Sequence, residues 1–156
     1  MAKKAGKKAE RSGPATIQNR RASFDYEITD TLECGIVLVG SEVKSLYHGR
    51  ANLTDGYVRI DGGEIFVHGL DIEPWTHASA FQPDRRRTRK LLAHRREIDL
   101  LERRAQEKGL ALIPLRVYFK NGRAKVLIGV ARGKRQYDKR ESIKEKDAKR
   151  GRVDEI

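Results

Sequence analysis

The sequence predicts a β-rich α+β fold: a small antiparallel β-barrel with two to three helices and a basic, disordered tail at each end. Three observations lead to this prediction. Several short segments alternate between apolar and polar residues, as strands do. Turn dipeptides such as Asn121-Gly122 separate them. Residues 1–15 and 132–156 lack the spaced apolar side chains that a core requires, so the barrel is expected over residues 16–131.

The first predicted elements are two strands. Residues 24–28 and 32–40 alternate, and a hairpin at Thr29–Thr31 is expected to join them. The second strand has one apolar face, which comprises Leu32, Cys34, Ile36 and Leu38. This face is expected to point into the core.

A helix and a second hairpin follow. Ser41 is expected to cap a helix over residues 41–49, which ends at Gly49. Its buried face is predicted to comprise Val43, Leu46 and Tyr47. The Asp61-Gly62-Gly63 turn predicts a hairpin between residues 57–60 and 64–68.

The second half begins with a long loop over residues 74–89, which leads into a basic cluster. A helix over residues 94–108 is expected to bury Ile98, Leu101 and Ala105.

Two alternating strands then flank Asn121-Gly122. Alternation predicts one face made of Ile113, Leu115, Val117 and Phe119. The opposite face is predicted to hold Pro114, Arg116 and Tyr118. Pro114 cannot donate to a ladder and is expected at an edge or a bulge. About six antiparallel strands and two helices together suggest a barrel of the oligonucleotide-binding kind.

The charge of the chain favours a polyanionic partner. The net charge is +12 and the isoelectric point is near 10.0. Residues 22–84 carry a net charge of −8, whereas residues 85–131 carry +10. This asymmetry predicts a localised binding face. The acidic half either faces another way or pairs with the basic half.

Few features point to catalysis or to a membrane. Cys34 is the only cysteine, and the four histidines lack metal-ligand spacing, so no disulfide, metal or cofactor is expected. Asp71 and Glu73 could form an acid/base pair, but a solvated strand edge explains them better. No signal peptide or long apolar run is seen, which predicts a cytoplasmic protein.

The strongest local signal for a partner is a run of five cations in six residues, Arg85, Arg86, Arg87, Arg89 and Lys90. Guanidinium groups bind phosphate bidentately and stack on bases, which suits folded RNA with unpaired loops. A solvated charge run is the alternative. Because aromatic residues are few, recognition of RNA shape is favoured over sequence readout.

Four stretches in this order, ATIQNRRASFDYEI, EVKSL followed by GRANLTDGYV, RTRKLL and GKRQYDKR, resemble the signature stretches of the small protein B family of tmRNA-binding proteins. The resemblance covers nearly the whole chain. It implies an oligonucleotide-binding-like barrel that holds the tRNA-like domain of tmRNA. The barrel and the bound RNA together would have the shape of a tRNA.

The resemblance also implies site residues. The family's tmRNA-binding positions fall on Asn19, Glu33, Lys90 and Leu92. The other candidate RNA contacts are Arg20, Arg21, Lys44 and the remaining members of the cation run. Glu33 repels phosphate, so it would have to accept from a base amino group, a 2′-hydroxyl or a neighbouring arginine.

The tail resembles the family segment that enters the empty mRNA channel near the decoding centre of the small ribosomal subunit. Its candidate residues are Gly133, Lys134, Arg135, Tyr137, Asp138, Lys139 and Arg140. Asp138, Lys139 and Arg140 match the element required for peptide tagging, Gly133 would be a hinge and Tyr137 a stacking residue.

The resemblance further implies elongation factor Tu as a partner, with alanylated tmRNA, and a monomer is expected. Phe24 and Arg135 depart from the common family residues, which leaves a polar contact at Phe24 in doubt and changes geometry at Arg135. The runner-up function is a general oligonucleotide-binding or ribosomal RNA-binding module without a tail mechanism. An RNA-modifying enzyme is a distant third, because no catalytic constellation is seen.

Overall fold

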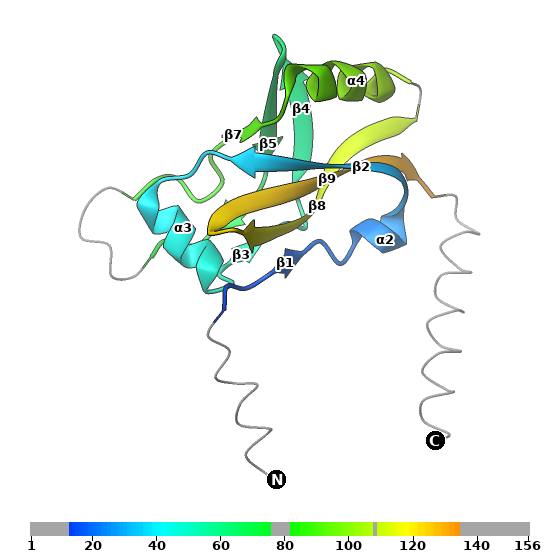
Figure 1. Cartoon of the computed structure of the whole chain (residues 1–156). Helices are drawn as coiled ribbons and strands as arrows, with labels where there is room; N and C mark the ends of the chain where they lie inside the picture. Colours follow the sequence, from blue (N-terminus) through cyan, green and yellow to red (C-terminus); the bar gives the residue numbers. More distant parts are fainter. Residues whose placement is uncertain (1–12, 76–81, 108, 135–156) are drawn as a thin grey trace, which may run out of the picture.

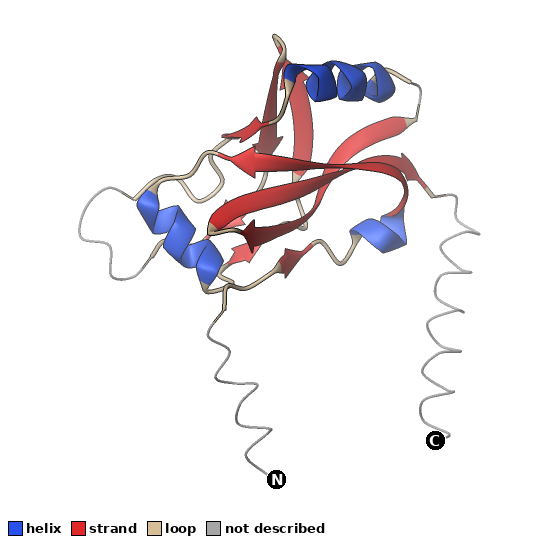
Figure 2. Ribbon diagram, in the orientation of Figure 1, coloured by secondary structure: helices blue, strands red, loops and turns tan. Residues whose placement is uncertain are grey.

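The computed structural model describes residues 13–75, 82–107 and 109–134, which form a strongly curved sheet with three helices (Figure 1, Figure 2). The helices are α2 (Ala22–Asp25), α3 (Gly40–Tyr47) and α4 (Arg95–Ala105). The strands are β1 (Ile17–Gln18), β2 (Tyr26–Ile36), β3 (Ala51–Asn52), β4 (Tyr57–Asp61), β5 (Glu64–His68), β6 (Asp71–Ile72), β7 (Arg89–Leu92), β8 (Leu110–Lys120) and β9 (Arg123–Gly133). The expected disorder of residues 1–12 and 135–156 concerns residues outside those described. Residues 13–15 of the predicted arm are described, and the Ala15 N–H donates to the carbonyl of Tyr47 at 3.0 Å.

Seven strands form one sheet in the order β1-β8-β9-β2-β7-β5-β4, and β3 pairs with β6. Every pairing is antiparallel. The sheet curls until β4 lies beside β8, although hydrogen bonds between described residues do not close it. The predicted oligonucleotide-binding-like barrel is therefore confirmed in approximate form.

The concave side of the sheet holds the main core. Cys34 of β2 and Val126 and Ile128 of β9 are almost fully buried there, as strand alternation predicts. Leu46 of α3 and Leu101 of α4 join the same core, so the two longer helices cover it from different sides (Figure 1). None of the described helices is long and apolar enough to cross a membrane.

The predicted hairpin at Thr29–Thr31 is wrong. Residues 26–36 form the single strand β2, which pairs with β9 along almost its whole length. A register shift between Ile28 and Asp30 marks a bulge, where the Thr29 hydroxyl donates to the carbonyl of Val130 at 3.2 Å. The polar residues that looked like a turn instead accommodate this extra residue. The first part of the other predicted strand, up to Asp25, belongs to α2.

Helix α3 is confirmed, but its cap and its buried face differ from expectation. The helix begins at Gly40, and the carboxylate of Glu42, rather than Ser41, accepts the N–H of Val39 at 3.0 Å. Val43 and Tyr47 are partly exposed, whereas Glu42, Ser45 and Leu46 are buried. Polar residues occupy the inner face because they have partners there: the Ser45 hydroxyl donates to the carbonyl of Glu73 at 2.7 Å.

Both glycine-containing hairpin turns are confirmed, between β4 and β5 and between β8 and β9. Asn121 and Gly122 have φ values of 53° and 77°, as the tight turn requires. The predicted alternation of β8 is wrong across Pro114, where a bulge shifts the register. Val117 therefore lies in the main core, and Ile113 lies in a second cluster with Ala22 and Ala131.

Two element boundaries also differ from prediction. The end of the expected loop and basic cluster forms strand β7, which lies between β2 and β5 in the sheet. At the other end of the barrel, β9 continues two residues beyond the predicted boundary at residue 131. Both differences place residues of predicted functional segments inside the sheet.

Candidate nucleic-acid interface

The convex side of the sheet presents two rows of side chains on neighbouring strands. Antiparallel register aligns the first row as Gln18, Arg116, Leu127 and Glu33. It aligns the second row as Tyr118, Lys125, Gly35 and Leu92. Their chain neighbours Cys34, Val117 and Val126 are buried, so these rows face outward. We call these eight residues the outer sheet face.

Glu33 is held in the middle of this face by a phenol and a cation. The Tyr118 hydroxyl donates a hydrogen bond to its carboxylate, and the Lys120 ammonium lies 3.5 Å from it. The Tyr118 hydrogen bond is the main reason that the pKa of Glu33 lies below its ordinary value. Burial, followed by the bond to Glu33, raises the pKa of Tyr118 to about 12. The carboxylate is therefore a fixed anion with exposed lone pairs.

Substitution of Tyr118 by phenylalanine is expected to raise the pKa of Glu33 toward its ordinary value of 4.5. A carboxylate with a lowered folded-state pKa stabilises the fold above its unfolded pKa, and this contribution is lost as the pH falls through the folded value. In Tyr118→Phe much of that contribution disappears. Carboxyl-selective NMR titration over the acidic range measures the shift. Equal Glu33 midpoints in the two proteins would contradict this assignment.

Leu92 and Glu33, two residues predicted from the family resemblance, come together on this face. They share with Lys125 the lining of a hollow of about 520 Å³. Leu92 is 53% exposed and lies against Gly35, where an added Cβ would meet the Leu92 Cβ at 3.4 Å. An apolar side chain, a carboxylate and an ammonium are thus within reach of one ligand.

The cation run between Arg85 and Lys90 is paired with the acidic half of the chain. Arg85 donates twice to Asp71, at 2.9 and 3.2 Å, and Arg86 lies 3.3 Å from Asp55. Lys90 lies 2.5 Å from Glu64 on the neighbouring strand. The charge asymmetry left open whether the acidic half faces another way or pairs with the basic half. In this cluster the two halves pair.

Arg89 is the clearest correction. Its side chain is fully buried and donates to Glu42 at 2.8 Å and to the carbonyls of Leu70 and Arg85 at 2.7 and 2.9 Å. Burial lowers the pKa of Arg89, while Glu42 opposes that effect. The expectation that Arg89 faces outward as an RNA contact is therefore wrong. Strand alternation is the cause, because Arg89 and Leu91 of β7 point inward.

Glu42 joins two arginines from the run. Arg87 binds its carboxylate bidentately at 3.0 and 2.6 Å, and Arg89 approaches it from the core side at 2.6 Å. Burial would raise the pKa of Glu42, but hydrogen bonds from Arg87, Val39 and Arg89 outweigh burial and hold the pKa low. We call these three side chains, Glu42, Arg87 and Arg89, the Glu42 clamp. It fixes α3 to the start of β7.

The cations without an acidic partner lie elsewhere. Within residues 13–75, 82–107 and 109–134, those that make no ion pair include Arg20, Lys44, Arg59, Arg96, Arg103, Arg123, Lys125 and Arg132. Lys125 lies on the outer sheet face, and Arg123 belongs to the same strand at the hairpin end. Lys44 is exposed on α3. These cations can attract phosphate without losing a carboxylate.

Asn19 lies at the end of β1, beside the first row. Its side-chain amide donates to the carbonyl of Pro114 at 3.0 Å, and its backbone N–H donates to Leu115 at 2.8 Å. Its Oδ1 atom is buried without a partner among the described residues. Next to it, Arg20 is exposed, and Arg21 lies 3.6 Å from Asp25. Asn19 therefore braces β8 and retains one unused acceptor.

The predicted tail begins against the barrel. Gly133 pairs with Tyr26 as the last residue of β9, so the expected hinge lies within a strand. Lys134 donates from its backbone to Asp25 at 3.0 Å and from its ammonium to the carbonyl of Ser23 at 2.7 Å. The other tail candidates, Arg135, Tyr137, Asp138, Lys139 and Arg140, lie outside the described residues.

Lys125 was not among the residues predicted from the sequence, although the sequence contains a signal for it. A two-residue turn at Asn121-Gly122 places Lys120 opposite Arg123 and Tyr118 opposite Lys125. Since Arg116 and Tyr118 were predicted to share a face, the hairpin register adds Lys125 to it. In the part of the chain that the structure describes, no three His, Cys, Asp or Glu side chains are placed to hold a metal ion.

Comparison with known proteins gives consistent results. The family model for SmpB protein matches residues 16–155. An SsrA-binding protein of Listeria welshimeri is 50% identical over 138 residues, which cover 88% of this chain and 90% of that protein. One of Bacillus subtilis is 50% identical over 139 residues, with 89% of each chain covered. A solved structure described as "tmRNA-SmpB: a journey to the center of the bacterial ribosome" contains a chain that is 45% identical to this one. The two structures match with a TM-score of 0.67, over 82% of this chain and 94% of that chain.

Proposed function

The chain belongs to the SmpB protein family, and from this premise we propose that its outer sheet face binds the tRNA-like domain of tmRNA during ribosome rescue. It is a tmRNA-binding component of trans-translation, with tmRNA and the ribosome as partners. The observation that carries the location of the site is the grouping of Glu33, Leu92 and Lys125 around one hollow.

The chemistry of this face suits a folded RNA. The fixed carboxylate of Glu33 can accept from a base amino group or a ribose 2′-hydroxyl, and Leu92 offers an exposed apolar surface to a base. Lys125 makes no ion pair with a carboxylate of the described residues and can neutralise a phosphate. Asn19 lies at the side of the same sheet, and the family resemblance, not its buried Oδ1 atom, is the reason that we include it. We assign these four residues as RNA contacts.

The half-exposed cations of the run are assigned a secondary role. Arg85, Arg86 and Lys90 form exposed ion pairs, each of which contributes little to the stability of the fold because water and salt screen it. A phosphate can replace such a carboxylate at small cost. Arg87 is different, because Glu42 holds it bidentately in a partly buried site. Arg87 is therefore assigned mainly to the fold.

The remaining parts of the proposal follow from the family. Residues 135–156 enter the mRNA channel near the decoding centre, where Asp138, Lys139 and Arg140 permit tagging. Elongation factor Tu, bound to alanylated tmRNA, is a further predicted partner. The chain itself has no catalytic role in this proposal, and its place of action is the cytoplasm, where ribosomes translate.

Affinity capture from a bacterial lysate, followed by sequencing of the bound RNA, tests this function. The full chain is expected to enrich tmRNA strongly over tRNA and ribosomal RNA. Leu92→Asp places a carboxylate on the outer sheet face and is expected to abolish this enrichment. Leu100→Asp is the matched control, because Leu100 is similarly exposed, at 58% against 53% for Leu92, but lies on α4. Enrichment of ribosomal RNA alone would favour the general RNA-binding module instead.

A further inference from the structure

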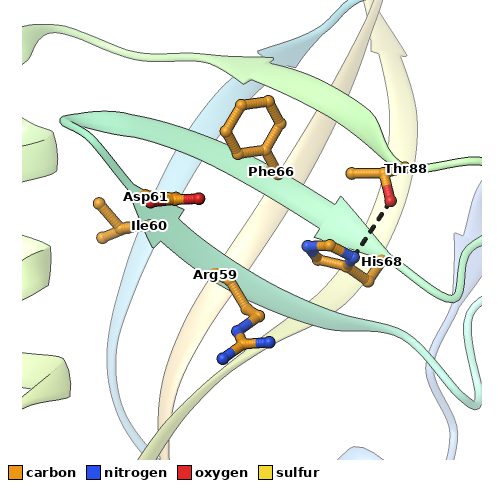
Figure 3. A pocket seen from close by; sticks show the side chains of 6 residues that line it. All are labelled: Arg59, Ile60, Asp61, Phe66, His68 and Thr88. Atoms are coloured by element: carbon orange, nitrogen blue, oxygen red, sulfur yellow. Dashed lines mark hydrogen bonds between the residues drawn. The ribbon is translucent and has the colours of Figure 1, made fainter.

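A second hollow lies on the convex side of β4 and β5, next to β7 (Figure 3). Its volume is about 490 Å³, and its lining comprises Arg59, Ile60, Asp61, Phe66, His68 and Thr88. None of these residues lines the hollow around Glu33 and Leu92. It is therefore a separate site, reached by continuing along the same sheet toward its β4 edge.

The rings of Phe66 and His68 line this hollow, and Tyr57 packs against His68. The ring of Tyr57 stacks on that of His68, with centroids 5.0 Å apart and planes 7° from parallel. His68 Nδ1 lies 3.1 Å from the Thr88 hydroxyl, which holds the imidazole in this orientation (Figure 3). Phe66 lies two residues before His68 in β5, so its side chain is on the same side of the strand. We call Tyr57, Phe66 and His68 the aromatic shelf; its Tyr57 member is 46% exposed.

A cation without an acidic partner stands beside this shelf. Register pairs Arg59 with Phe66, and Phe66 with Lys90, so the three side chains lie in one row across three strands. Arg59 is exposed and makes no ion pair among the described residues, whereas Lys90 is paired with Glu64. Figure 3 shows the Arg59 side chain extending from β4 away from Asp61.

Rings beside a guanidinium have the chemistry that binds an unpaired nucleotide. Every nucleobase has a π-face that stacks on aromatic side chains, and arginine binds phosphate bidentately. Asp61 repels phosphate but can accept from an exocyclic amino group, which orients the nucleotide with its phosphate toward Arg59. A peptide ligand would need a more apolar groove, whereas the lining of this hollow includes two ionic groups, Arg59 and Asp61.

We propose that the aromatic shelf and Arg59 form a subsite for one unpaired RNA nucleotide, with its base on the rings and its phosphate on the guanidinium. This proposal rests on the proposed function, because it extends the RNA-binding surface from β2 and β7 to β4 and β5. It assigns roles to Tyr57, Arg59, Phe66 and His68, and it gives the RNA a contact with the β4 edge of the sheet.

Two fluorescein-labelled probes test the subsite with the full chain: a single-stranded octamer of adenosine and the transcribed tRNA-like domain of tmRNA. Phe66→Leu keeps apolar volume but removes the π-face, and Arg59→Ala removes an exposed cation. Each substitution removes one contact, a stacked base in Phe66→Leu and a phosphate contact in Arg59→Ala. Each is expected to weaken binding of the octamer about tenfold. Arg103→Ala removes an exposed cation from α4, away from the subsite, and is expected to bind as the unsubstituted chain does.

NMR of the His68 ring locates the bound base. Addition of the octamer is expected to shift the His68 ring signals upfield, as a stacked base would, and in Phe66→Leu the same shift is expected to need about ten times more octamer. Unchanged octamer affinity in Arg59→Ala, absent His68 shifts or no octamer binding at all would each overturn the subsite. Failure of the proposed function has a different signature, namely no binding of the tRNA-like domain by the unsubstituted chain.

Discussion

Replacement of Glu42 by alanine is expected to lower the free energy of unfolding by about 3–5 kcal/mol, a large fraction of the stability of a small domain. The Glu42 carboxylate is almost fully buried, and it accepts from both arginines of the Glu42 clamp. Its removal leaves the guanidinium of Arg89 buried without a counter-charge. Removal of one partner from a buried ion pair costs far more stability than replacement of both partners by well-packed apolar residues does.

Urea unfolding, followed by circular dichroism, measures this loss. Glu64→Ala is the matched control, because it removes a carboxylate from the exposed ion pair with Lys90 and is expected to cost below about 1 kcal/mol. Glu42→Gln keeps the shape and some hydrogen bonds, and its loss should lie between the two. A Glu42→Ala loss as small as that of Glu64→Ala would show that the clamp does not stabilise β7.

Removal of residues 135–156 is expected to reduce peptide tagging to background while the protein keeps its affinity for tmRNA. The barrel should be intact in a chain that ends at Lys134, since β9 and both hydrogen bonds of Lys134 to α2 are retained. A cut at residue 131 would remove two paired residues of β9. The removed segment has eight Lys and Arg against six Asp and Glu, so little net charge for RNA attraction is lost.

A reconstituted translation system with ribosomes stalled on a truncated message measures the tagging, and anisotropy titration with the tRNA-like domain measures the affinity. A full-length Asp138→Ala, Lys139→Ala, Arg140→Ala chain serves as the second variant, because it keeps the tail length. It is expected to bind tmRNA normally and to tag poorly. Normal tagging by the chain ending at Lys134 would reduce the protein to an RNA-binding module without a tail mechanism.

The fold was predictable from the sequence where local patterns decide it. The turns at Asn121-Gly122 and Gly62-Gly63 demand backbone conformations that few other dipeptides adopt, and both hairpins were predicted correctly. The bulges at Thr29 and Pro114 had the opposite effect. The bulge at Thr29 made one strand look like two strands joined by a turn. The bulge at Pro114 shifted the alternation by one position, so Ile113 and Val117 lie in different clusters although the pattern predicted one face for both.

The candidate site was predictable only in part, because charge partners are far apart in the sequence. Glu42 lies 45 and 47 residues from the arginines that it binds, and no local pattern joins them. The cation run therefore looked like a phosphate-binding surface, whereas most of its charges are paired within the fold. Glu33 and Leu92 were identified through the family resemblance, and only the order of strands in the sheet brings them together.

The salt dependence of binding to the tRNA-like domain tests most directly whether the outer sheet face contacts the RNA. The logarithm of affinity is measured against the logarithm of salt concentration for the unsubstituted chain, Lys125→Ala and Arg103→Ala. Lys125→Ala is expected to reduce the slope by about one unit, as loss of one phosphate contact does, and Arg103→Ala to leave it unchanged. Equal slopes for Lys125→Ala and the unsubstituted chain would contradict the assignment of the RNA to this face.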